Sequence, residues 1–317
     1  MNLRLLILLL IIMCIICNGE SLENLKELSC WNCPLITLPE LPQSLENILC
    51  WDCPLLTTLP ELPQSLLYLE CYNCPLLATF PELPYSLKHF WYREFRLTIL
   101  PKLPQSLISL ECSYCPLLTT LPELPKSLEK FWCYNCPLLI TFPELPQSLI
   151  GFYCSYCPLL TILPELPQSL TYLLCKSCPL LTILPDLPQT LTTFNCSYCP
   201  LLTILPELPQ SLISLDCSYC PLLTILPELP QSLTHLNCEG CTSLIFSSDN
   251  NKHRISPVLQ ETINSNYLKW RKEQTLNWFS STHGIVYEDL IRKTWHPSRV
   301  VDWCWDTKEV KWFKSLK

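Results

Sequence analysis

Apolar residues recur along most of the chain with a period of 20 or 21 residues. The leucine that opens each of the eleven periods stands at Leu25, Leu45, Leu66, Leu87, Leu107, Leu128, Leu149, Leu170, Leu191, Leu212 and Leu233. The apolar positions within a unit are the first, fourth, sixth, ninth and eleventh, as in Leu212, Leu215, Cys217, Cys220 and Leu222. Alternation over so few residues predicts one short strand per unit, and the constant period predicts a stacked solenoid.

In ten of the eleven units the second half reads LPELP or a close variant. Pro206 and Pro209 fix φ and donate no hydrogen bond, which favours an extended, polyproline-like return and excludes a helix there. The chain has 31 prolines and only 4 glycines. This scarcity of glycine predicts a coil that closes without residues at positive φ.

These units resemble leucine-rich repeats, which carry apolar residues at the same offsets and Asn or Cys at the ninth position. The LPELP half is similar to the short repeats of secreted bacterial effectors and to leucine-rich repeats of large DNA viruses of amoebae. The resemblance covers residues 22–246. It implies an α/β repeat solenoid with short parallel strands on the concave face, extended returns on the convex face and a small helical C-terminal cap.

The first residues have the layout of a secretory signal peptide. A basic start is followed by an apolar run at residues 5–17, and Gly19 is a small residue before a cleavage point. We therefore expect residues 1–19 to be a signal peptide and the protein to be secreted. The alternative is an uncleaved segment that anchors the protein in a membrane through residues 5–17.

The repeat stops before residues 250–317, whose apolar stripes predict helices that cap the last open rung. This region has 12 basic and 7 acidic residues, a net +5, whereas residues 1–249 have a net −12. The overall charge of −7 argues against nucleic-acid binding.

Cys304 and Asp306 form a CxD motif similar to that of effector-type ubiquitin ligases, so an enzyme using Cys304 is an alternative function.

Ten units contain a CxxC motif, and 20 of the 23 cysteines lie in the repeat. Three interpretations stay open: buried thiols, disulfides between rungs, and four-cysteine zinc sites. Unit 4 has Tyr92 and Phe95 in place of the cysteines, which favours buried volume over metal ligation, and we predict no metal and no cofactor. Stacked cysteines would lie about 4.8 Å apart, but two cysteines of one extended unit would lie about 10 Å apart.

The third, fifth and seventh positions of each unit should face outward on the concave side. In units 2 to 8 they carry the aromatic residues Trp51, Tyr68, Tyr72, Trp91, Trp132, Tyr134, Tyr153 and Tyr172. Exposed aromatic clusters are typical of protein interfaces, so we predict a non-enzymatic recognition module that binds a protein partner through these residues. The alternative is a purely structural repeat protein, in which the rings only cover neighbouring rungs.

Overall fold

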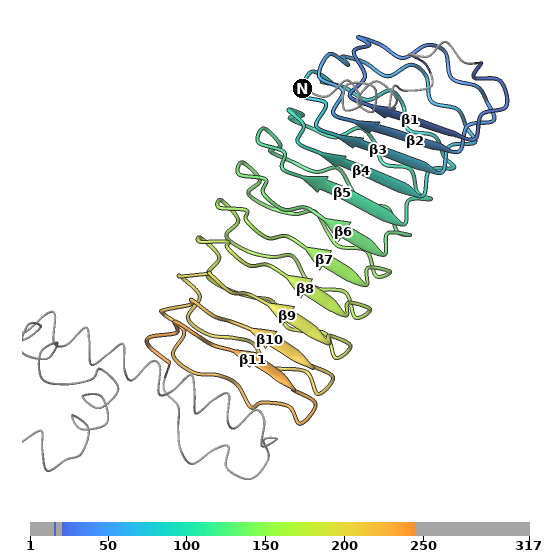
Figure 1. The fold of residues 1–317 in the computed structure, drawn as a ribbon. Coiled ribbons are helices and arrows are strands. Elements are labelled where there is room, and N and C mark those ends of the chain that lie inside the picture. The colour runs from blue at the N-terminus through green and yellow to red at the C-terminus, as the bar shows by residue number, and fades with distance from the viewer. Residues whose placement is uncertain (1–15, 17–20, 245–317) are drawn as a thin grey trace, which may run out of the picture.

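The structure is a computed structural model that describes Ile16 and residues 21–244. Eleven strands pair in parallel and in chain order within a single sheet. They are β1 (Glu27–Trp31), β2 (Asn47–Trp51), β3 (Tyr68–Tyr72), β4 (His89–Arg93), β5 (Ser109–Ser113), β6 (Lys130–Trp132), β7 (Gly151–Tyr153), β8 (Tyr172–Leu174), β9 (Thr193–Asn195), β10 (Ser214–Asp216) and β11 (His235–Asn237). One strand per unit confirms the predicted solenoid, as Figure 1 shows.

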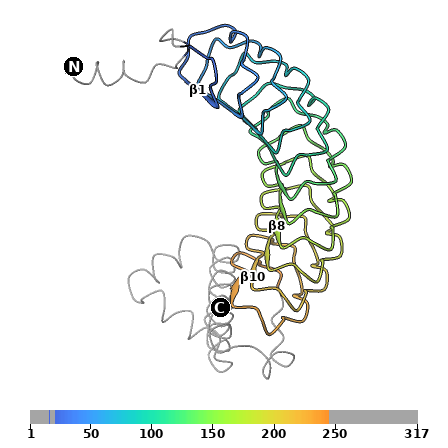
Figure 2. The same ribbon diagram turned by 90° about the vertical axis from the view of Figure 1, so that its right-hand side faces the viewer.

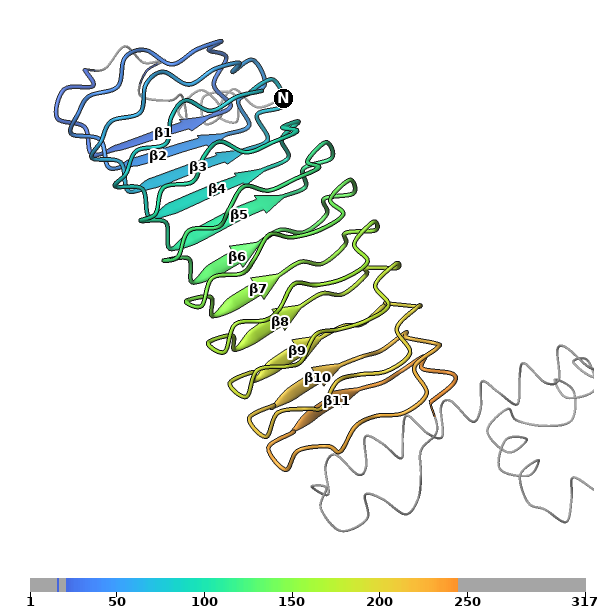
Figure 3. The same cartoon turned by 180° about the vertical axis from the view of Figure 1, so that it is seen from behind.

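The solenoid is curved, and its strands lie on the inner side of the arc (Figure 2). The returns follow the outer side, and the same order of rungs is seen from behind in Figure 3. Among the described residues the returns form isolated bridges, such as Ile162 with Ile183 and Ile204 with Ile225. The part of the chain that the structure describes therefore contains strands and extended returns without a helix.

The predicted ends of the chain lie mostly outside the described residues. Of the predicted signal peptide only Ile16 is described, and it packs against the hydrophobic core. The helical cap predicted for residues 250–317 is not among the described residues, so the helical part of the α/β class stays a prediction. Within the described part, no helix has the length and hydropathy needed to cross a membrane.

The core repeats from rung to rung and corrects one position of the sequence pattern. Leu212, Leu215 and Cys217 are buried as predicted, but Leu222 is 45% exposed. The next residue, Leu223, is buried in its place. The inward position is therefore the twelfth of the unit, because the turn after the strand shifts the alternation by one residue.

That turn contains a residue at positive φ in all eleven units, so the prediction of a coil without such residues is wrong. The eighth position has φ between +49° and +72° in Asn32, Asp52, Asn73, Glu94, Tyr114, Asn135, Tyr156, Ser177, Tyr198, Tyr219 and Gly240. Only the last of these is a glycine. Asn and Asp tolerate the left-handed region better than most residues, whereas Tyr and Glu are held there against their intrinsic preference.

The same turn brings the two cysteines of a unit close together. The sulfur atoms of Cys133 and Cys136 are 3.7 Å apart, so the expectation of about 10 Å within one unit is wrong. The distance of about 10 Å applies to an extended chain, whereas Asn135 at φ +57° folds the chain back between the two side chains. The 20 repeat cysteines are all buried.

Two ladders of side-chain hydrogen bonds join consecutive rungs. In ten cases the hydroxyl of the Ser or Thr that ends a unit donates to the carbonyl of the opening leucine of that unit, at 2.6 to 2.9 Å. In eight cases the thiol at the ninth position donates to the carbonyl of the sixth residue in the preceding unit, as Cys178 does to Cys154 at 3.3 Å. Both ladders satisfy buried carbonyls that a short strand leaves without a partner.

Removing one hydroxyl of the serine ladder should destabilise the fold measurably. Ser169 donates to the carbonyl of Leu149 at 2.7 Å, and we expect Ser169→Ala to lower the free energy of unfolding by about 1 to 2 kcal/mol. Ser169→Thr should be nearly neutral, because Thr190 makes the same bond in the next unit. Urea unfolding of the three proteins measures this, and an alanine variant as stable as the wild type would contradict the role of the ladder.

Candidate functional site

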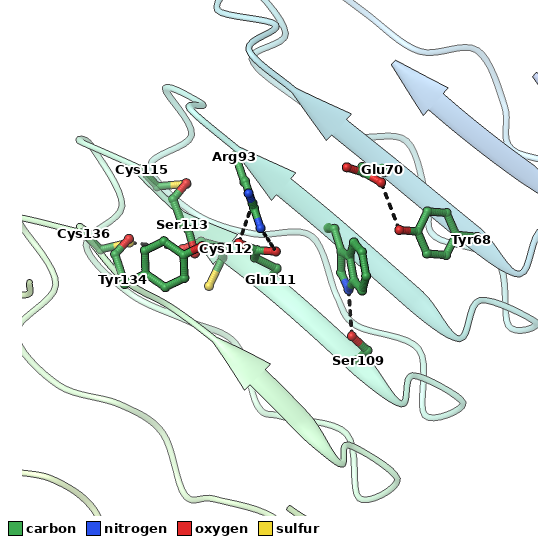
Figure 4. A network of polar contacts seen from close by, with 11 residues as sticks. Tyr68, Glu70, Arg93, Ser109, Glu111, Cys112, Ser113, Cys115, Tyr134 and Cys136 are labelled. Atoms are coloured by element: carbon green, nitrogen blue, oxygen red, sulfur yellow. Dashed lines mark hydrogen bonds and ion pairs between the residues drawn. The ribbon is translucent and has the colours of Figure 1, made fainter. Parts of the chain in front are cut away.

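A carboxylate lies at the centre of the concave face in an environment that normally excludes charge. Glu111 on β5 is only 3% exposed. The Arg93 guanidinium from β4 donates to both of its carboxylate oxygens, at 2.5 Å from Nε and 2.9 Å from Nη2, and the Tyr134 hydroxyl donates at 2.9 Å (Figure 4). Such a bidentate pair holds the charge in place and fixes the surrounding side chains.

Aromatic rings cover this carboxylate and continue along the face. The Trp91 and Trp132 rings come from strands on either side of β5, yet their centroids are only 6.2 Å apart. Tyr68 extends the row at one end, 5.2 Å from Trp91, and Tyr153 extends it at the other, stacked 5.3 Å from Trp132. We call Tyr68, Trp91, Trp132 and Tyr153 the aromatic row.

The aromatic row passes over β5, whose outward residues Ser109 and Glu111 are only 2% and 3% exposed. Ser109 is small, and the rings from β4 and β6 meet across this strand. The Trp91 indole nitrogen donates to the Ser109 hydroxyl at 2.7 Å, which fixes the orientation of this ring. The row is therefore held by directed hydrogen bonds as well as by ring packing.

The phenol hydroxyls of Tyr68 and Tyr134 donate hydrogen bonds to carboxylates. Tyr68 donates to Glu70 at 2.9 Å, and burial, followed by this hydrogen bond, raises the pKa of Tyr68. Burial and the charge of Glu111 likewise raise the pKa of Tyr134. Both phenols stay protonated at neutral pH and act as hydrogen-bond donors.

The structure brings together five of the eight predicted binding residues, namely the aromatic row and Tyr134. The other three have no ring contact with it among the described residues: Trp51 is 38% exposed, Tyr172 is 44% exposed, and Tyr72 is half-buried at the end of β3. The prediction omitted Trp31, which is 46% exposed. Trp31 occupies the seventh position of unit 1, so the same positional rule would have found it.

The cysteines form no metal site within the described ranges, where no group of three or more His, Cys, Asp or Glu side chains is arranged to hold an ion. Burial raises the pKa of Cys154, Cys175 and Cys196 well above the usual thiol value. A thiol that stays protonated is a poor nucleophile. Cys304, the candidate ligase nucleophile, lies outside the described residues.

Comparisons with known proteins agree with this architecture. Residues 211–233 match the family model for the Leucine Rich Repeat. YopM from Yersinia enterocolitica is similar over 67% of this chain and 51% of its own, with 32% identity and a TM-score of 0.52. This chain thus spans about half the length of that YopM chain. A comparison with curated proteins gives no match.

A second solved structure shares the fold. The functional domain of InlJ from Listeria monocytogenes is similar over 74% of this chain and 58% of its own, with 22% identity and a TM-score of 0.50. That domain is described as including a cysteine ladder. At this level of identity the likeness concerns the solenoid architecture.

Proposed function

Because the chain is a leucine-rich-repeat protein, we propose that its concave face recognises a protein partner and catalyses no reaction. The observation that carries this proposal is the aromatic row, which runs across β3 to β7 on the inner side of the arc. Aromatic side chains contribute large contact areas at a low cost in conformational entropy, and they dominate the energetics of many interfaces.

The hydrogen bonds beneath the row support the same proposal. The Ser109 hydroxyl fixes the Trp91 ring, and Trp91 packs edge to face against Trp132, before any partner arrives. A preorganised surface loses less conformational entropy on binding than a mobile one. The carboxylates and phenols of this face are engaged in hydrogen bonds that position neighbouring side chains. This arrangement favours recognition over catalysis.

Capture of partners by immobilised protein tests this proposal. We expect Trp91→Ala combined with Trp132→Ala to weaken binding of the captured partner by at least about 30-fold, which is the loss of two interface anchors. Ile204→Ala combined with Ile225→Ala is the matched control, because both isoleucines are exposed on the returns. Mass spectrometry identifies the partner, and a titration of that partner measures its affinity for each variant.

The result is interpreted only for variants that keep the wild-type circular dichroism spectrum. Trp132→Phe serves as a second variant, because it keeps a ring over Glu111 while reducing the exposed contact area. Equal affinity of the tryptophan and isoleucine variants for the partner would overturn the proposal. It would favour the purely structural alternative, in which the rings shield the sheet.

The proposed place of action is outside the cell, on the basis of the signal-like residues 1–19. Attachment to a membrane through residues 5–17 is the alternative. Sequencing the N-terminus of the mature protein distinguishes the two, because a cleaved protein lacks the apolar run and an anchored one keeps it.

A further inference from the structure

A second group of aromatic residues lies at one edge of the sheet, away from the aromatic row. Trp31, Trp51 and Tyr72 are the last residues of β1, β2 and β3, and we call them the aromatic edge. The strands are parallel and in register, so these three side chains occupy successive rungs. Trp31 and Trp51 are among the most exposed large aromatic residues of the concave face.

Carboxylates follow the aromatic edge at the left-handed turn position. Asp52 accepts hydrogen bonds from the Trp31 indole nitrogen at 3.2 Å and from the Asn73 amide at 2.7 Å. Both bonds come from neutral donors, so the negative charge of Asp52 is not neutralised. Two rungs further on, Glu94 occupies the same turn position.

The electrostatic field at this edge is negative. The charge of Glu94, followed by its hydrogen bond, raises the pKa of Tyr72, and Asp52 acts in the same direction. Arg93 pairs in register with Tyr72 and acts on this pKa in the opposite direction, but its guanidinium is bound to Glu111. The edge therefore combines aromatic faces with the two carboxylates Asp52 and Glu94, and the pKa of Tyr72 is raised on balance.

Exposed aromatic faces beside carboxylates are suited to a guanidinium group, which stacks on rings and donates to carboxylate oxygens. A related cation–ring contact occurs within the chain, where the Lys176 ammonium lies 5.2 Å from the centroid of the Tyr156 ring. We propose that the aromatic edge binds an arginine-rich segment of the protein partner. This inference rests on the proposed function and adds the chemistry of the ligand.

The test uses the full chain and a short fluorescein-labelled peptide of alternating arginine and serine. Its counterpart carries citrulline in place of arginine, which keeps the shape of the side chain and removes its charge. Fluorescence anisotropy should show at least about tenfold tighter binding of the arginine peptide, and the difference should shrink as salt is raised. Asp52→Asn and Trp51→Ala should each weaken binding of the arginine peptide by about three- to tenfold.

The matched control is Glu207→Gln, which removes one exposed carboxylate from the returns. If this control weakens binding as much as Asp52→Asn, the attraction is due to net charge and the inference is wrong. Equal binding of the arginine and citrulline peptides would also overturn it. If either of these results is obtained while Trp91→Ala combined with Trp132→Ala still loses partner capture, only the arginine-binding edge is wrong. The proposed function then stands.

Discussion

Raising the pH from about 7.5 to about 9.5 under reducing conditions is expected to cost the solenoid several kcal/mol of stability. The cause is the stack of buried thiols along the core. Burial raises the pKa of Cys178 and Cys220 to about 12 and that of Cys199 to about 11. An unfolded cysteine has a pKa of about 8.5.

The fall in stability with rising pH follows from the number of protons that the folded and unfolded states bind. Below about pH 8.5 both states hold the thiol proton, so the thiols contribute no pH dependence. Above it the unfolded chain loses protons that the folded chain retains, and stability falls until the folded pKa is reached. At about pH 9.5 each thiol costs about 1.4 kcal/mol, or about 4 kcal/mol for these three, against a typical total of about 5 to 15 kcal/mol.

Urea unfolding at several pH values, with a reductant present, measures this loss. The comparison is a variant in which Cys178, Cys199 and Cys220 are replaced by serine, which keeps a hydrogen-bond donor for the ladder and has no thiol to ionise. Its stability should fall less steeply with pH than that of the wild type, whatever its stability at neutral pH. Parallel pH profiles of the two proteins would contradict the assignment to thiols.

Phe152→Ala should produce the largest loss of stability for a single substitution in the middle of the solenoid. The Phe152 side chain is fully buried, stacks on Phe131 at 5.6 Å and meets Phe142 edge to face at 5.0 Å. Truncation removes both ring contacts and leaves a cavity between rungs. We expect a loss of about 3 to 5 kcal/mol in the free energy of unfolding.

The repeat provides the matched control, because Leu173 occupies the same position on the next strand. Phe152→Leu should therefore cost about 1.5 kcal/mol or less. Chemical denaturation of both variants gives the comparison. If alanine and leucine are equally tolerated, the ring contacts in this column do not determine the stability of the central units.

The sequence is sufficient to predict the number of rungs, the parallel order of the strands and the sorting of concave and convex residues. Each position recurs eleven times, so a preference that is weak in one unit becomes unambiguous across the repeat. The pattern fails at the turn, where Leu222 and Leu223 are both apolar and adjacent. The left-handed residue before them rotates the chain, and counting alternate residues across it selects the wrong leucine.

The site is predictable as a set of outward positions and unpredictable as a set of contacts. Trp91 and Trp132 are two rungs apart, which corresponds to about 10 Å between their backbones. Their rings meet across a rung that carries the small residue Ser109, to which the Trp91 indole nitrogen donates. Which rings meet depends on side-chain rotamers and on this hydrogen bond, and the spacing of residues in the sequence contains neither.

The two hydrogen-bond ladders also bear on how the chain folds. Their bonds join residues that are close in sequence, because the hydroxyl of Ser169 reaches back to Leu149 and the thiol of Cys178 reaches back to Cys154. No ladder bond among the described residues spans more than 24 positions. Folding can therefore nucleate at any well-packed pair of rungs and spread in both directions, with each new rung using its neighbour as a template.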